Sequence, residues 1–182
     1  TSLIEATLDF QFEVLTTYLN DGNRKPKRSS YNNAHAYLSA PYGIYKTKDS
    51  YIAIAMTPVP ALGKLLGLES IIKYNEQKDW FVKRDEIKKL IGDWLSLKNT
   101  QEWLSILQPA DIWCSEVLEW DKLLQEEGFK VLDMIQEIKR PDGLNLKTLR
   151  CPIRINNQIS KSDVAAPKIG ENTLQITEEF KL

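Results

Sequence analysis

Histidine and cysteine are scarce in this 182-residue chain, and their scarcity excludes several kinds of site. The single histidine, His35, rules out zinc centres built from several imidazole ligands. The two cysteines, Cys114 and Cys151, form no C-x-x-C pair, which argues against a cysteine metal site and against a disulfide framework. The chain also lacks the glycine-rich phosphate-binding motifs and the G-x-S-x-G nucleophile motif. We therefore expect no metal and no nucleotide-binding fingerprint.

Neither sign of charge is in excess, because 24 Lys and Arg residues against 25 Asp and Glu residues give a formal net charge of -1. Nucleic acids and anionic membrane surfaces attract proteins with an excess of cations, so this balance argues against both partners. No apolar run approaches the roughly 20 residues of a membrane-spanning helix. The few unpaired cysteines fit a reducing compartment, and we expect a cytoplasmic protein.

The segment Ala40–Met56, APYGIYKTKDSYIAIAM, predicts a β-hairpin. Aromatic and β-branched residues fill both arms, and the polar turn 48–50 separates them. Pro41 stands before the first strand, where a missing N–H does little harm. Because the pattern after the hairpin is helical for a long way, we expect the hairpin to form the sheet on which those helices pack.

Helical periodicity dominates the start and the middle of the chain. A capping box at Ser2 and Glu5 begins an amphipathic helix that continues to Leu19. Its apolar stripe has no neighbour in sequence, so we expect it to pack on a distant element or on another chain. The clearest helix is Asp85–Leu97, and a second capping box at Asn99 begins the next one.

The last third of the chain predicts short elements. Residues 111–116 are interpreted as a turn or strand, and residues 117–127 as short helices. Residues 131–138, 144–149 and 152–155 are strand candidates, and a final helix is expected at 174–180. The sequence therefore predicts an α+β fold, with a short antiparallel sheet packed by helices.

A long polar connection, Gly22–Ser39, joins the first helix to the hairpin, and long connections are often functional. Its four cations could meet phosphate groups or form an ordinary solvated basic loop; they are Arg24, Lys25, Lys27 and Arg28. In the same connection, His35 could face a ligand or hydrogen-bond the backbone.

The other candidate catalytic groups have a structural explanation. The carboxylates between Asp111 and Glu127 are not fixed on one buried face, so a solvated surface explains them better than acid–base catalysis. Cys114 has no nearby histidine, so we expect a buried structural thiol. The residues by themselves therefore indicate no self-contained catalytic centre.

Several motifs, taken in order, resemble the later part of family III CoA-transferases, the CaiB/BaiF family. The motifs are SLIEATLDF, APYGIYKTKDSYIAIAM, RDEIKKLIGDWLSLKNTQEWLSILQPADI, SEVLEWDKLLQEEGFKVLDM, CPIRIN and APKIGENT. Pro109 and Asp111 replace the glycine and valine of the family pattern. The order and spacing of the motifs along nearly the whole chain make the resemblance specific.

The resemblance implies a CaiB/BaiF fold, in which a small α+β domain accompanies a large Rossmann-like domain. It also implies acyl-CoA and a free carboxylate as substrates, with coenzyme A exchanged between them through a mixed anhydride on an aspartate. That aspartate and most CoA contacts belong to the family's first half, which would precede Thr1. No catalytic residue is therefore assigned here. The upstream half of the same protein and a second copy in an interlocked homodimer are the expected partners, and the chain by itself is expected to be inactive.

The resemblance further implies three parts: a crossing helix and loop from the large domain at 1–39, the small α+β domain at 40–150, and a C-terminal return to the large domain at 151–182. Many members place a mobile loop over the active site just before the APYG strand. Asn33 and His35 are the best matches to this lid, although the glycine-rich version is missing here. Two alternatives remain: a racemase-type acyl-CoA enzyme of the same fold, which abstracts a proton, and a non-catalytic interaction module.

Overall fold

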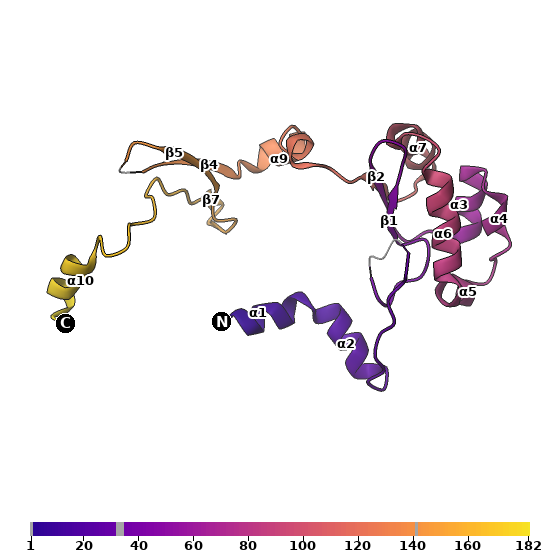
Figure 1. The fold of residues 1–182 in the computed structure, drawn as a ribbon, viewed down its shortest axis with the longest axis horizontal. Helices are drawn as coiled ribbons and strands as arrows, with labels where there is room; N and C mark the ends of the chain where they lie inside the picture. The colour runs from indigo at the N-terminus through magenta and orange to yellow at the C-terminus, as the bar shows by residue number, and fades with distance from the viewer. Residues whose placement is uncertain (1, 32–34, 141) are drawn as a thin grey trace. The chain divides into compact units, whose positions relative to one another are not determined.

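The computed structural model describes residues 2–31, 35–140 and 142–182. The chain divides into two compact units, Thr1–Val117 and Leu118–Leu182, and most of their elements are labelled in Figure 1. The boundary falls inside the 40–150 segment that the family resemblance assigns to one domain. The assignment of the three parts to domains of a whole protein stays a prediction.

The first unit combines helices with one small sheet. Its elements in chain order are α1 (Leu3–Phe10), α2 (Phe12–Asn20), β1 (Gly43–Lys46), β2 (Tyr51–Ile54), α3 (Val59–Leu66), α4 (Glu69–Ile72), α5 (Gln77–Val82), α6 (Arg84–Leu95), α7 (Thr100–Leu107), the 3₁₀ turn η1 (Gln108–Ala110) and β3 (Cys114–Glu116). The predicted hairpin is confirmed, since β1 and β2 pair antiparallel with Gly43 opposite Ile54. Strand β3 pairs antiparallel with the other edge of β2, so the sheet order is β1-β2-β3.

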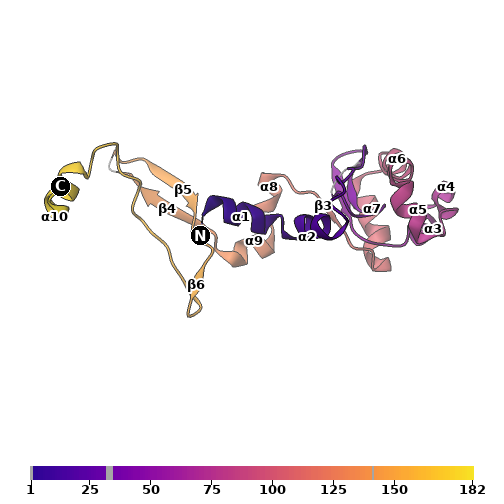
Figure 2. The ribbon, with the colours of Figure 1, turned by 90° about the horizontal axis from the view of Figure 1, so that it is seen from below.

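One face of this sheet is buried under helices. Tyr45, Ile52 and Ile54 are at most 2% exposed and belong to the main hydrophobic core. The helices add Leu62, Ile91 and Trp103. Helices α3, α4 and α6 lie on one side of the sheet in Figure 1, and Figure 2 gives the same arrangement from below. Burial of a large apolar side chain stabilises a fold by about 1.5–3 kcal/mol, so this layer holds the unit together.

The turn of the hairpin is joined to the start of α7. Asp49 Oδ1 accepts hydrogen bonds from the backbone N–H of Thr100 at 2.8 Å and from its hydroxyl at 3.0 Å. The hydroxyl oxygens of Thr47 and Thr100 are 2.7 Å apart. The predicted capping box at Asn99 is also confirmed. The carboxylate thus satisfies N–H and O–H donors at the positive end of the helix.

The N-terminal region forms two helices, whereas the sequence predicted one. Gln11 interrupts the helix with φ -96° and ψ 11°, although the capping box at Ser2 is present as predicted. No residue of α1 or α2 is buried. Leu3 and Phe10 are 90% and 93% exposed, so the described residues of this unit leave the apolar stripe uncovered.

The second unit contains α8 (Trp120–Leu123), α9 (Glu127–Leu132), β4 (Ile135–Lys139), β5 (Asn145–Leu149), β6 (Arg154–Ile155), β7 (Gln158–Ile159) and α10 (Thr173–Phe180). Strands β4 and β5 form one antiparallel hairpin, and β6 and β7 form a shorter one. The strand predicted at 144–149 is confirmed, and so is its pairing with the preceding strand, but the prediction of a strand from residue 131 is wrong at its start, because residues 131–132 end α9 and β4 begins at Ile135. Helices with small antiparallel sheets in both units confirm the predicted α+β fold.

A buried arginine takes the place of an apolar core in the second unit. Among its described residues only Arg150 is buried, at 3% exposed. Its guanidinium donates hydrogen bonds to the carbonyls of Leu132, Asp133 and Cys151, each at 2.7 Å. These bonds join the end of α9 to the end of β5. Across the described part of the chain, no helix has both the length and the apolar character to cross a bilayer.

Candidate functional site

The polar connection before the hairpin is attached to the first turn of α6 through Asp85. Asp85 Oδ1 accepts hydrogen bonds from the Ser29 hydroxyl at 2.7 Å and from the Ser30 backbone N–H at 2.8 Å. Ser29 is itself buried, with 5% of its surface exposed. The hydrogen bond from Ser29 is the main reason that the pKa of the Asp85 carboxyl is lowered.

Arg84 attaches the connection at a second point. Its guanidinium donates to the carbonyl of Ala36 at 2.9 Å and to the carbonyl of Lys27. The guanidinium carbon lies 4.3 Å from the centre of the Phe81 ring, a cation–π contact. We refer to Arg84 and Asp85 as the α6 clamp, because the two side chains hold both flanks of the candidate lid. Sequence reasoning missed this role, since charges in the first turn of a helix usually face solvent.

The two ring nitrogens of His35 have different surroundings. Its Nδ1 accepts a hydrogen bond from the Tyr37 N–H at 3.2 Å, so Nε2 carries the hydrogen of the neutral ring. Nε2 is a buried atom without a hydrogen-bond partner in the described residues, and Glu13 Oε1 lies 3.9 Å away. His35 therefore makes the backbone contact and still presents one donor. Asn33, the other lid candidate, lies outside the described residues.

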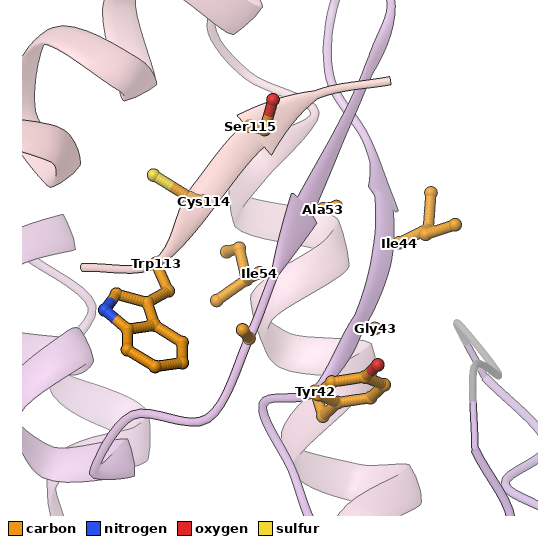
Figure 3. A pocket seen from close by; sticks show the side chains of 9 residues that line it. Tyr42, Gly43, Ile44, Ala53, Ile54, Trp113, Cys114 and Ser115 are labelled. Carbon is orange, nitrogen blue, oxygen red and sulfur yellow. The ribbon is translucent and has the colours of Figure 1, made fainter. Parts of the chain in front are cut away.

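An apolar hollow of about 480 Å³ opens at one end of the three-stranded sheet (Figure 3). It is lined by Tyr42, Gly43, Ile44, Ala53, Ile54, Ala55, Trp113, Cys114 and Ser115. Tyr42 precedes β1 and Trp113 precedes β3, so their rings flank the end of the central strand β2. Trp113 is 67% exposed, which is unusual for the largest apolar side chain. Such a wall suits an apolar or aromatic group.

Cys114 lies in the wall of this hollow and is half-buried. Burial raises the pKa of its thiol. A raised pKa disfavours the thiolate, which is the nucleophilic form, and so agrees with a structural thiol, although Cys114 is half-buried and not fully buried as the sequence predicted. In the described ranges, no group of three or more His, Cys, Asp or Glu side chains has an arrangement that could hold a metal ion.

The family model for CoA-transferase family III matches residues 1–173, and the chain therefore belongs to this family. The match confirms the resemblance that the sequence motifs indicated. It includes α1, the hairpin, the α6 clamp and the segment that leads to α10.

Two curated proteins illustrate the relationship. The chain is 29% identical over 147 residues to cinnamoyl-CoA:phenyllactate CoA-transferase from Clostridium sporogenes. It is 24% identical over 140 residues to (R)-2-hydroxy-4-methylpentanoate CoA-transferase from Clostridioides difficile. These matches cover 75% and 72% of this chain but 35% of each relative. The chain thus spans about a third of the length of these two relatives.

Solved structures show the same fold. A CAIB/BAIF family protein from Brucella suis matches with a TM-score of 0.62 and 22% identity, over 91% of this chain and 43% of that chain. Rv3272 from Mycobacterium tuberculosis, in an orthorhombic crystal form, matches with a TM-score of 0.64 and 19% identity, over 96% of this chain and 46% of that chain. The expected CaiB/BaiF fold is thereby confirmed.

Proposed function

We propose that this chain is part of an enzyme that moves CoA from an acyl-CoA to a free carboxylate. One observation carries the proposal: the match to CoA-transferase family III extends over residues 1–173. The names of the two curated relatives add support, because both are CoA-transferases and each name contains a carboxylic acid or its acyl-CoA. The class of substrate proposed here is accordingly an acyl-CoA with a carboxylate acceptor.

The proposed chemistry is covalent catalysis by an aspartate that this chain does not supply. The aspartate attacks the thioester carbonyl, the CoA thiolate leaves, and a mixed anhydride forms. The thiolate then attacks the aspartyl carbonyl and releases the first carboxylate. The acceptor carboxylate attacks the resulting aspartyl thioester, the CoA thiolate leaves, and a second mixed anhydride forms. The thiolate finally attacks the acceptor's carbonyl, and the aspartate leaves. Together, these steps replace one difficult transfer by a series of easier acyl exchanges.

The residues of this chain would cover and orient the reacting groups. The connection that contains Asn33 and His35 acts as the lid, and Nε2 of His35 offers a hydrogen-bond donor to a substrate oxygen. The α6 clamp holds the flanks of this lid in place through Ser29 and the Ala36 carbonyl. Exclusion of water protects the mixed anhydride, which water would otherwise hydrolyse. An interlocked homodimer, with the upstream half of the same protein, would complete the site.

The test compares this chain with a longer polypeptide that carries the upstream half. With acyl-CoA and an ¹⁸O-labelled carboxylate acceptor, the longer polypeptide should form the new acyl-CoA and gain ¹⁸O on one aspartate. The 182-residue chain should show neither effect. Transfer without label on the protein would overturn the anhydride route. Exchange of an α-deuterium without any acceptor would identify a racemase-type enzyme, and neither activity would leave an interaction module.

A further inference from the structure

A second hollow, of about 330 Å³, lies between the polar connection and the start of α6. Four exposed cations of the connection line it: Arg24, Lys25, Lys27 and Arg28. We refer to it as the basic hollow. It belongs entirely to the first unit, and it is separate from the apolar hollow on the sheet.

The positive charge of the basic hollow is only partly neutralised, because cations outnumber carboxylates among the residues that line it. None of the four exposed cations forms an ion pair in the described part of the chain. Two carboxylates also line the hollow, Asp21 and Asp85, and Oδ1 of Asp85 already accepts two hydrogen bonds. Cations within one short segment repel each other, and a bound anion would relieve that repulsion.

A buried cation, Arg84, adds to the same wall. Arg84 is 6% exposed, and the carbonyls of Lys27 and Ala36 hold its guanidinium in place. A guanidinium fixed in this way keeps its charge and loses no side-chain freedom when an anion arrives. The basic hollow is therefore a built site and differs from a row of mobile surface lysines.

The hollow also offers groups that suit a base and a sugar. Phe81 lines it and remains 43% exposed, although Arg84 covers part of the ring. The hydroxyl of Tyr37 is buried and has no hydrogen-bond partner in the described residues. An aromatic ring beside cations is the usual combination for a nucleotide, because bases stack on rings while phosphates pair with Lys and Arg.

We propose that the basic hollow binds a nucleotide through its phosphate groups. This chemistry is shared by the 3′,5′-ADP portion of CoA and by free nucleotides. The overall composition, with a net charge of -1, does not reveal this site. The four cations lie together in one segment, while the acidic residues are spread over the chain. If the bound nucleotide is the 3′,5′-ADP portion of CoA, the inference rests on the proposed function. Binding can nevertheless be measured without any transfer activity.

The experiment is isothermal titration calorimetry on the full 182-residue chain, with 3′,5′-ADP as the first probe. We expect saturable binding that weakens as salt is raised. Adenosine should bind at least about tenfold more weakly, because it lacks the phosphates. The double variant Lys25→Gln/Lys27→Gln should lose about tenfold in affinity for 3′,5′-ADP.

The matched control is Lys46→Gln/Lys64→Gln, which removes the same charge from exposed lysines outside the hollow. It should bind 3′,5′-ADP like the unmodified chain, and thermal unfolding should show that both variants remain folded. Equal affinity of the two double variants, or equal binding of adenosine, would overturn the proposal. CoA binding that is stronger than that of dephospho-CoA and ADP would support CoA as the source. Equal binding of all three would support a free nucleotide.

Discussion

Asp49 and Thr100 are joined by two hydrogen bonds to one carboxylate oxygen, although 51 positions separate them in the sequence. The bonds connect the turn of the β1–β2 hairpin to the first turn of α7. The backbone N–H of Thr100 is the main reason that the pKa of the Asp49 carboxyl is lowered. Because the folded pKa is depressed, this contact stabilises the fold above the unfolded value of about 3.9, and its contribution is lost as pH falls further.

Replacing Thr100→Val tests this connection. Thr100 is 1% exposed, and its hydroxyl lies within hydrogen-bond distance of Asp49 and Thr47. The substitution removes the side-chain hydrogen bonds of this buried hydroxyl, while Asp49 Oδ1 keeps the Thr100 N–H and Thr47 Oγ1 keeps the Ser50 N–H, so the free energy of unfolding should fall by about 1–2 kcal/mol in urea titrations. The control is Ser105→Ala on the same helix, where an exposed hydroxyl bonds only the Glu102 carbonyl. A control as destabilised as Thr100→Val would show that the hydroxyl contacts are unimportant.

Gly63 of α3 lies close to α4 and to the residue before that helix. A Cβ atom at Gly63 would lie 2.8 Å from Ile71 Cγ1 and 3.1 Å from the backbone oxygen of Leu68. The backbone oxygen cannot move aside as a side chain could, so Gly63→Ala should lower the free energy of unfolding by about 1–3 kcal/mol. At Gly128 in α9 a Cβ meets nothing within 4 Å, so Gly128→Ala should not destabilise the chain. Thermal unfolding of the two variants checks the contrast.

Because of Lys88, the free energy of unfolding should depend on pH in the alkaline range. Its side chain is fully buried, and burial, with a smaller effect of Arg84, lowers its pKa to about 8. The unfolded chain holds this proton up to about pH 10.4, so folding stability should rise between the two values. Relative to Lys88→Met, the unmodified chain should gain at most roughly 3 kcal/mol over that interval. Urea unfolding at both ends of the interval measures the gain, and a constant difference would contradict it.

The α6 clamp should control the mobility of the candidate lid. Asp85→Ala removes the acceptor for the Ser29 hydroxyl and the Ser30 N–H. Backbone amides of residues 29–31 and 35–37 should then exchange with deuterium several-fold faster, because local opening costs less free energy. Asp93→Ala on the same helix is the control, since among the described residues that carboxylate pairs only with exposed Lys89. Equal exchange in both variants would exclude a clamp at Asp85.

The roles of the two ring nitrogens of His35 can be tested separately. His35→Asn retains an acceptor near the Tyr37 N–H and removes the Nε2 donor. In the longer transferase of the proposed function, we expect unchanged thermal stability and a kcat lower by about tenfold, the effect of one lost hydrogen bond. Wild-type kcat in His35→Asn would assign His35 to the backbone contact alone.

Local patterns sufficed for the elements whose contacts are close in sequence. The hairpin at 40–56 and the capping box at Asn99 follow from alternation, turn residues and cap chemistry, and the structure confirms both. Strand β3 has only three residues, and its pairing with β2 joins segments about sixty positions apart. No local pattern specifies such a partner.

The candidate site was less predictable for a related reason. His35 could be named from its residue type and the family motif, but Arg84 and Asp85 acquire their role only when the polar connection folds back onto α6. The aromatic pair at the end of α5 shows the same limit. Large aromatic side chains in a helical segment are usually buried, which by residue type alone would place both Trp80 and Phe81 in the core. Trp80 packs against the core, whereas Phe81 is 43% exposed beneath Arg84.

Burial of an arginine, and of no other described residue, in the second unit has a thermodynamic consequence. Arg150 donates hydrogen bonds to three carbonyls. Such bonds fix the local geometry, but their net contribution to stability is smaller than that of the hydrophobic effect on burying apolar side chains. Residues 118–182 should then unfold at lower denaturant concentration than the sheet-and-helix unit. A partner that binds the folded form of these residues would raise their melting temperature as its concentration increases, as mass action requires.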